Sequence, residues 1–193
     1  SVVYQGHDLT KLTREEIKPL RRDLQIVFQD PQSSLNPRLT ISTILTEPMK
    51  AHSIGSNGDD RIKLARQTLK QVGLDPAMLS RFPHEFSGGQ RQRIGIARAL
   101  VLNPKFIVCD EVTSALDVRV QAQILKLLDE LRNQFDLTYL FISHNIEVVR
   151  YFCDDISVMH QGKIVEFGRA NEVCDNPNHA YTRRLIEAVP KFD

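Results

Sequence analysis

The chain has 193 residues, of which 41% are hydrophobic and 25% are charged. This length suits one globular domain with a hydrophobic core, and the composition excludes a disordered, fibrous or collagen-like chain. Lysine and arginine together number 25, against 24 aspartates and glutamates. The near-neutral balance therefore gives no support for nucleic acid as a partner.

Targeting signals and a disulfide framework are both missing from the sequence. No apolar run approaches the roughly 20 residues that a membrane-spanning helix needs, and the first ten residues lack the charged-then-apolar pattern of a signal peptide. The three cysteines, Cys109, Cys153 and Cys174, are an odd number at wide spacing, which fits neither disulfides nor a zinc site. We therefore expect a cytoplasmic chain with reduced cysteines.

Residues 39–98 contain no strand-like run. Within this stretch, residues 41–51 and 60–74 have the character of helices. The intervening residues 52–60 are rich in glycine, serine, asparagine and aspartate, which is typical of a loop. This part of the chain therefore predicts a helical subdomain.

A further helix is expected to begin at Ser87, where the sequence reads Ser-Gly-Gly. The first turn of a helix has unpaired N–H groups, its dipole favours an anion, and glycines let a ligand approach the backbone. The alternative is an ordinary capped helix with a tight turn. Apolar residues such as Ile94 and Ala97 give the helix an inward face, and it should end before Pro104. In this context the segment predicts a phosphate-binding helix start.

Residues 105–110 and 138–143 are short apolar runs, which predict strands covered on both faces of a parallel sheet. Apolar residues at helical spacing between them predict a helix over residues 118–135. Strand, helix and strand together indicate an α/β fold. A short helix over residues 145–152 and a hairpin turning at Gln161-Gly162 should follow.

Polar residues follow both predicted strands. Asp110 and Glu111 end the first strand, and His144 follows the second. Open α/β sheets bind ligands at the carboxyl ends of their strands. One carboxylate there can hold magnesium, its neighbour can orient an attacking water, and the imidazole can touch a terminal phosphate. The alternatives are a solvated acidic loop and a structural histidine, but convergence on one edge favours phosphate chemistry.

Together these motifs resemble the nucleotide-binding subunit of ABC transporters. The similarity covers essentially the whole chain, with the motifs in the order that the family has. The matches are VFQD at 27–30 for the Q-loop with Gln29, SGGQR at 87–91 for the signature, FIVCDE at 106–111 for Walker B with the catalytic glutamate, SALD at 114–117 for the D-loop, and His144 for the switch histidine.

The resemblance implies ATP and Mg²⁺ as cofactors. It assigns Gln29 and Asp110 to the magnesium ion and the attacking water. It makes Glu111 the general base and His144 the contact to the γ-phosphate. The residues that it implies for binding ATP, including ATP held on a partner subunit, are Ser87, Gly88, Gly89, Gln90 and Asp117.

The resemblance also implies a fold, namely a mainly parallel α/β sheet core of P-loop NTPase type with an inserted helical subdomain. Residues 1–38 would form part of the ATPase core with the Q-loop. Residues 39–98 would form the helical subdomain that ends in the signature motif. Residues 99–193 would complete the core with Walker B, the D-loop, the H-loop and a C-terminal tail of importer type.

Two segments resemble the oligopeptide, dipeptide and nickel importer branch of the family. They are VFQDPQSSLNPRLT and the tail NPNHAYTRRLIEAVPKFD. The alternative is that such loops vary freely and say nothing of cargo. The branch implies a head-to-tail partner ATPase, transmembrane permease subunits and, indirectly, an extracytoplasmic solute-binding protein. Its subunits lie peripherally on the cytoplasmic face of the inner membrane.

The sequence departs from the family in places. Departures that remove no catalytic group are Cys109 within Walker B, Val112 and Ala180 where prolines are usual, and Asn145 where aspartate is common. The larger departure is that no G-x-x-x-x-G-K-[ST] motif occurs in the chain. We therefore expect a carboxyl-terminal, N-terminally truncated fragment that does not hydrolyse ATP by itself.

The function expected from the sequence is that of an ATP-binding and ATP-hydrolysing subunit of an ABC importer, with peptides as the expected cargo. One alternative is a non-catalytic module that supplies only its signature face to a partner. Another is a soluble ABC-type ATPase of DNA repair or translation, which the near-neutral charge and the importer-like tail disfavour.

Overall fold

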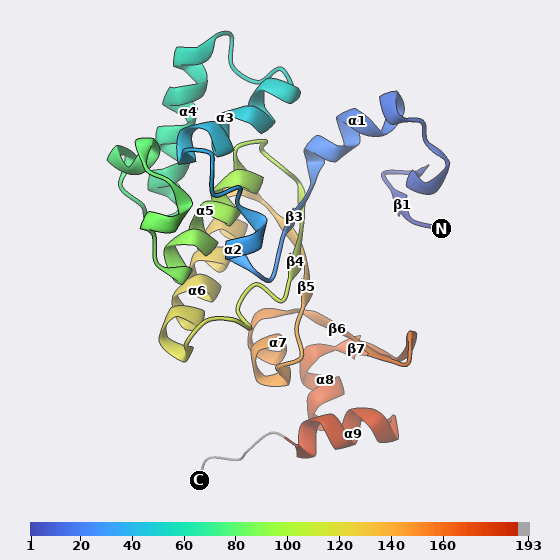
Figure 1. The fold of residues 1–193 in the computed structure, drawn as a ribbon. Coiled ribbons are helices and arrows are strands. Elements are labelled where there is room, and N and C mark those ends of the chain that lie inside the picture. The colour runs from blue at the N-terminus through green and yellow to red at the C-terminus, as the bar shows by residue number, and fades with distance from the viewer. Residues whose placement is uncertain (189–193) are drawn as a thin grey trace. The chain divides into compact units, whose positions relative to one another are not determined.

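The computed structural model describes residues 1–188, which form nine α-helices and seven strands (Figure 1). They fall into two compact units, of which the first is Ser1–Leu140 and the second begins at Phe141. No helix among these residues is long and apolar enough to cross a membrane.

The first unit contains most of the secondary structure. Its strands are β1 (Val3–Tyr4), β2 (His7–Asp8), β3 (Leu24–Val27), β4 (Phe106–Asp110) and the start of β5 (Thr138–Ile142). Its helices are α1 (Arg14–Asp23), α2 (Pro31–Ser34), α3 (Ile41–Ala51), α4 (Gly58–Gln71), α5 (Gly88–Leu100) and α6 (Val118–Phe135). Short 3-10 helices lie at Leu9–Lys11, Pro76–Ser80 and Pro83–Glu85.

The central sheet has the order β3-β4-β5. Strands β3 and β4 are parallel and pair in register from Leu24 opposite Phe106 to Val27 opposite Cys109. The crossover from β4 to β5 runs through α6, as a strand–helix–strand unit requires. This arrangement confirms the predicted α/β fold.

Strand β5 departs from the expectation of burial on both faces. Tyr139 is half-buried and its hydroxyl donates a hydrogen bond to the carbonyl of Leu128 in α6 at 3.0 Å. Burial raises the pKa of this hydroxyl. Successive side chains of a strand point to opposite faces, so Leu140 points away from α6, and its side chain is 50% exposed. The prediction of two covered faces is therefore wrong for this strand.

The stretch 39–98 contains no strand, as predicted, and its helices α3, α4 and α5 pack against one another. Asparagine and threonine side chains cap two of them. Thr40 accepts a hydrogen bond from the N–H of Thr43 at the start of α3, and Asn57 accepts one from Asp60 at the start of α4. The fully buried apolar side chains that hold these helices together include Ile41, Leu45, Met49, Leu69, Ile94 and Ile96.

The second unit contains α7 (Ile146–Phe152), the hairpin of β6 (Asp155–His160) and β7 (Lys163–Arg169), α8 (Ala170–Asp175) and α9 (Ala180–Glu187). The hairpin turns at Gln161 and Gly162, which have φ angles of 50° and 76°. Two successive residues with positive φ are the mark of a type I′ turn, whose twist matches that of the strands. The predicted turn is therefore confirmed.

The importer-like tail is held to this hairpin. The Glu166 carboxylate of β7 accepts hydrogen bonds from the N–H groups of Asn178 at 2.7 Å and His179 at 3.0 Å. Ala180 is the first residue of α9. The proline that is usual in the family is also tolerated at this position, because the N–H group that proline lacks would have no acceptor within the helix. The last five residues of the tail, 189–193, lie outside the described residues.

Packing beneath β5 gives a first prediction. Leu128 is fully buried in α6, so Leu128→Ala should lower the free energy of unfolding by about 2–5 kcal/mol. The matched control Leu140→Ala removes the same atoms from a half-exposed side chain and should cost no more than about 1.5 kcal/mol. Urea unfolding followed by circular dichroism measures both. Equal losses would contradict this assignment of the core.

Candidate functional site

Parallel pairing of β3 with β4 brings two predicted site residues together. Val27 lies opposite Cys109. Gln29 and Glu111 come two positions later in the chain, just past the ends of β3 and β4. The Gln29 Nε2 group donates to Glu111 Oε2 at 2.7 Å and to Ser114 Oγ at 3.3 Å. A glutamine and a carboxylate that are 82 positions apart in the chain thus share one hydrogen bond at the carboxyl ends of two neighbouring strands.

The backbone at Glu111 is in the left-handed region, with a φ of 46°. This conformation is uncommon for a residue other than glycine and is found at functional sites more often than elsewhere. Ser114 holds the turn, because its N–H and its hydroxyl both donate to the Glu111 carbonyl, at 3.1 and 3.0 Å. Ser114 therefore contacts both Gln29 and Glu111.

Ser114 is a site residue to which the sequence analysis assigned no role of its own. It lies in the SALD match, and the signal that could have found it is a serine three residues after an acid at a strand end, where serine hydroxyls form local turns. Its contact with Gln29 depends on the strand pairing and could not be read from the local sequence.

Asp110 is the last residue of β4 and is half-buried, as predicted for an acid at the sheet edge. Within residues 1–188, no group of three or more histidine, cysteine, aspartate or glutamate side chains is arranged to hold a metal ion. Mg²⁺ commonly uses one or two protein oxygens and takes its other ligands from phosphates and water. The oxygens of Asp110 and Gln29 fit this donor set.

The start of α5 is capped by its own side chains. The Ser87 hydroxyl accepts from the Gln90 N–H at 3.4 Å, and Gln90 Oε1 accepts from the Ser87 N–H at 3.0 Å. This capping box leaves the N–H groups of Gly88 and Gly89 without acceptors in the helix. The helix start is thus capped, as the alternative of an ordinary capped helix requires. Its first N–H groups can also donate to an anion.

The two glycines of this helix start have different surroundings. A Cβ atom at Gly89 would lie 2.6 Å from Cγ1 of Val120 in α6, whereas one at Gly88 would come no closer than 3.9 Å to Leu116. Close packing of α5 against α6 therefore requires glycine at position 89. Packing thus explains the missing side chain at Gly89 but not the one at Gly88.

Side chains of α5 also hold the segment around Gln29. Gln92, which is 1% exposed, donates from Nε2 to the Phe28 carbonyl at 3.4 Å, and Arg98 donates to the Ser34 carbonyl. Burial lowers the pKa of Arg98. Gln92 was not predicted as a site residue. Its signal is a glutamine four positions before Ile96 and seven before Ala99, which places it on an apolar stripe of the predicted helix.

Two further predicted site residues are Asp117 and His144. Asp117 caps α6, where its Oδ1 accepts from the Val120 N–H at 2.9 Å, so its carboxylate has a structural role. His144 belongs to the second unit, is exposed and stands two residues after the end of β5. The next residue, Asn145, caps α7 by accepting from the Glu147 N–H at 3.0 Å. Roles for Asp117 and His144 toward a nucleotide stay predictions.

Comparison with known proteins identifies the class of this chain, because the solved structures that resemble it are ABC ATPase cassettes. One is CbiO1 from Clostridium perfringens, with a TM-score of 0.74 and 29% identity over 92% of this chain and 68% of that one. Another is MJ0796 bound to ADP and Pi, with a TM-score of 0.73 and 31% identity over 86% of this chain and 72% of that one. The fold is that of these cassettes.

The family follows from the sequence. A family model described as ABC transporter matches residues 1–114, which is more than half of the chain, and the protein belongs to this family. The oligopeptide transport ATP-binding protein AppF of Bacillus subtilis strain 168 is 48% identical over 98% of this chain and 57% of its own length. OppF of Streptococcus mutans has the same identity over 98% of this chain and 62% of its own. The chain therefore spans about three fifths of these relatives.

The unequal glycines give a second prediction. Gly89→Ala should lower the free energy of unfolding by about 1–3 kcal/mol, because the new methyl group overpacks the contact with Val120. The matched variant Gly88→Ala has room for the methyl group and should change stability by less than about 0.5 kcal/mol. Thermal or urea unfolding of both variants measures the difference. Equal stability would mean that α5 and α6 do not approach as closely as described.

Proposed function

We propose that this protein is the ATP-binding and ATP-hydrolysing subunit of an importer for peptides, in which hydrolysis is coupled to transport. The observation that carries the proposal is the contact of Gln29 with Glu111, which joins the predicted Q-loop to the predicted catalytic carboxylate. Membership of the ABC transporter family supports ATP-driven transport. The relatives named as oligopeptide transport proteins support peptides as the cargo.

Bound Mg²⁺-ATP supplies the phosphoryl group whose transfer to water releases the free energy. Asp110 and Gln29 would hold the ion with their side-chain oxygens, together with phosphate and water. The Glu111 carboxylate would accept a proton from the attacking water, the role of a general base. Its bond from Gln29 holds the carboxylate at the sheet edge. His144 would contact the terminal phosphate.

The signature residues would act on a nucleotide held by another subunit. Gly88 and Gly89 would donate their N–H groups to its phosphates, with Ser87, Gln90 and Asp117 beside them. A second ATPase subunit in head-to-tail arrangement would carry that nucleotide. The structure of MJ0796 with ADP and Pi is a dimer, which supports such a pair.

The proposal extends to the partners and to the parts of the chain. Transmembrane permease subunits would bind the protein at the cytoplasmic face of the membrane, and an extracytoplasmic solute-binding protein would deliver the cargo to them. Residues 1–38 and 99–193 would belong to the ATPase core, and residues 39–98 would form the helical subdomain that closes on the partner's nucleotide.

A chimera tests the proposed chemistry. The chain joined to the AppF segments that flank the matched region should hydrolyse Mg²⁺-ATP and should restore oligopeptide uptake to Bacillus subtilis lacking AppF. Glu111→Gln in this chimera should retain ATP binding and lose hydrolysis by about 100-fold or more, because the general base is gone. Phosphate release and equilibrium ATP binding are the measurements.

The unmodified chain of 193 residues is the control for this experiment. It has no G-x-x-x-x-G-K-[ST] motif to surround the β- and γ-phosphates, so we expect no turnover from it. Circular dichroism shows whether each protein is folded. Turnover that persists in the Glu111→Gln chimera would place the base elsewhere and contradict the proposed role.

The signature contact can be tested separately through dimer formation. In the chimera carrying Glu111→Gln, ATP should drive dimerisation, and Ser87→Arg should abolish it because a long cationic side chain then fills the place of the phosphate. Ser157→Arg adds the same charge at an exposed position of β6 and is the matched control. Size-exclusion chromatography with light scattering gives the oligomeric state. An ATP-dependent dimer in the Ser87→Arg protein would reduce the helix start to a structural cap.

A further inference from the structure

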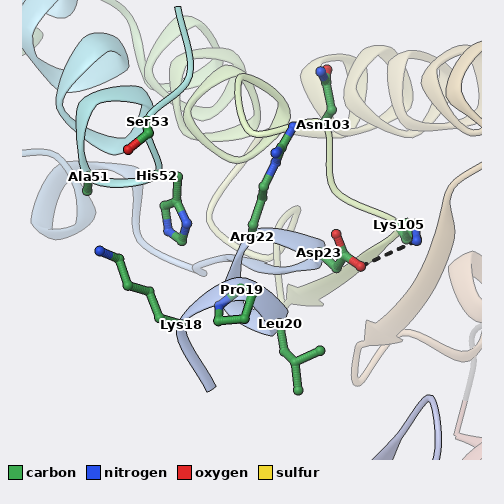
Figure 2. A pocket seen from close by; sticks show the side chains of 10 residues that line it. All are labelled: Lys18, Pro19, Leu20, Arg22, Asp23, Ala51, His52, Ser53, Asn103 and Lys105. Atoms are coloured by element: carbon green, nitrogen blue, oxygen red, sulfur yellow. Dashed lines mark ion pairs between the residues drawn. The ribbon is translucent and has the colours of Figure 1, made fainter. Parts of the chain in front are cut away.

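A cavity of about 580 Å³ lies in the first unit between α1, the end of α3 and the segment that leads into β4 (Figure 2). None of the residues proposed to bind ATP or magnesium lines it. Four basic side chains surround this one space, namely Lys18 and Arg22 from α1, His52 at the end of α3, and Lys105. Basic side chains therefore collect around this cavity.

Asp23, the one acid among the described residues that line the cavity, is already paired. Its carboxylate forms an ion pair with Lys105 at 3.5 Å (Figure 2). Within residues 1–188, neither Lys18 nor Arg22 forms an ion pair. These two residues are four positions apart on α1, where like charges are neighbours and repel. The cavity therefore has two positive charges that no described carboxylate balances.

Three basic groups that line the cavity can donate hydrogen bonds into it. Arg22 is held by a hydrogen bond from its Nε to the Leu102 carbonyl at 3.2 Å, and its terminal N–H groups remain as further donors. In Figure 2 the Lys18 side chain ends below Ala51 on one side of the His52 ring, and Arg22 extends on the other side of the ring toward Asn103. An ammonium, a guanidinium and an imidazole thus border one cavity, and all three are donors suited to an oxyanion.

His52 responds to this surplus of charge. Burial lowers its pKa, and the charges of Lys18 and Arg22 lower it further. His52 is also the C-cap of α3, where the helix dipole favours the protonated ring. The charged groups that line the cavity with it are Lys18, Arg22, Asp23 and Lys105. An anion between these groups would offset the repulsion, so it would favour protonation of His52 and bind more tightly as the pH falls.

We propose that this cavity binds a phosphate group of a small phosphorylated molecule or of a phospholipid, through Lys18, Arg22 and His52, at a site separate from the proposed ATP site. The space is larger than a single phosphate needs. Pro19, Leu20 and Ala51 add apolar surface to the lining, which suits an organic part attached to the phosphate.

Isothermal titration of the 193-residue chain with inorganic phosphate and with pyrophosphate tests the site directly. Saturable binding of one anion per chain is expected. The double variant Lys18→Gln/Arg22→Gln should weaken the affinity by about tenfold or more, because two charge-assisted contacts are lost. Lys63→Gln/Arg66→Gln removes the same charge from exposed positions on α4 and should bind like the unmodified chain. If circular dichroism shows that the double variant is unfolded, Lys18→Gln alone provides a second test.

Sulfate, whose charge is constant over the range, tests the role of His52. Its affinity should rise as the pH falls from about 7.5 to below about 6, because the pKa of His52 without the anion lies below the ordinary histidine value of about 6.5. An NMR titration should show the His52 ring protonating at higher pH when sulfate is present. His52→Asn should remove the pH dependence of sulfate binding, and this variant should still bind sulfate at the higher pH.

Vesicle sedimentation distinguishes the two sources of phosphate. The vesicles are phosphatidylcholine containing phosphatidic acid. If the chain binds anions in solution but does not sediment with these vesicles, the ligand is a free phosphorylated molecule. If the chain sediments with the vesicles and the Lys18→Gln/Arg22→Gln variant does not, the ligand is a lipid headgroup. No saturable binding of either anion or of vesicles, or equal affinity in the Lys18→Gln/Arg22→Gln variant, would overturn the proposal.

Discussion

The in-register parallel pairing of β3 with β4 is the constraint on which the candidate site depends. Parallel strands end at the same edge of a sheet, so the residues that follow Val27 and Cys109 must lie side by side. Gln29 and Glu111 are those residues, and their hydrogen bond follows from the register. A shift of one residue would separate the glutamine from the carboxylate and would also move every side chain of β3 to the opposite face.

Helix α5 secures this arrangement from the other side. Its buried Gln92 holds the Phe28 carbonyl next to Gln29, and Arg98 holds the Ser34 carbonyl beyond it. An unsatisfied buried amide is costly, so the position of Gln92 and that of the strand end depend on each other. The same helix begins at the signature motif. Its first turn and the segment around Gln29, the predicted Q-loop, are therefore parts of one packed unit, and a displacement of α5 would move both.

Local rules were sufficient to predict much of the fold. The helices at Ile41–Ala51 and Val118–Phe135 have the bounds that apolar periodicity indicates, because a helix buries one stripe of its own residues. The turn at Gln161-Gly162 follows from the glycine, which adopts a positive φ without steric cost. The exposure of Leu140 was not predictable in this way. An apolar run indicates a strand, but which of its faces is covered depends on elements that are distant in the sequence.

The glycine pair of the signature shows the same limit within the candidate site. From the sequence, Gly88 and Gly89 have two explanations, the approach of a phosphate to the helix start and a tight turn before an ordinary capped helix. In the structure, Gly89 is also required by Val120, which lies in another helix, and no local pattern contains that contact. Ser114 is similar, since its contact with Gln29 exists only after β3 and β4 have paired. A motif thus identifies which residues matter at a site, whereas the division of their roles between ligand and packing depends on tertiary contacts.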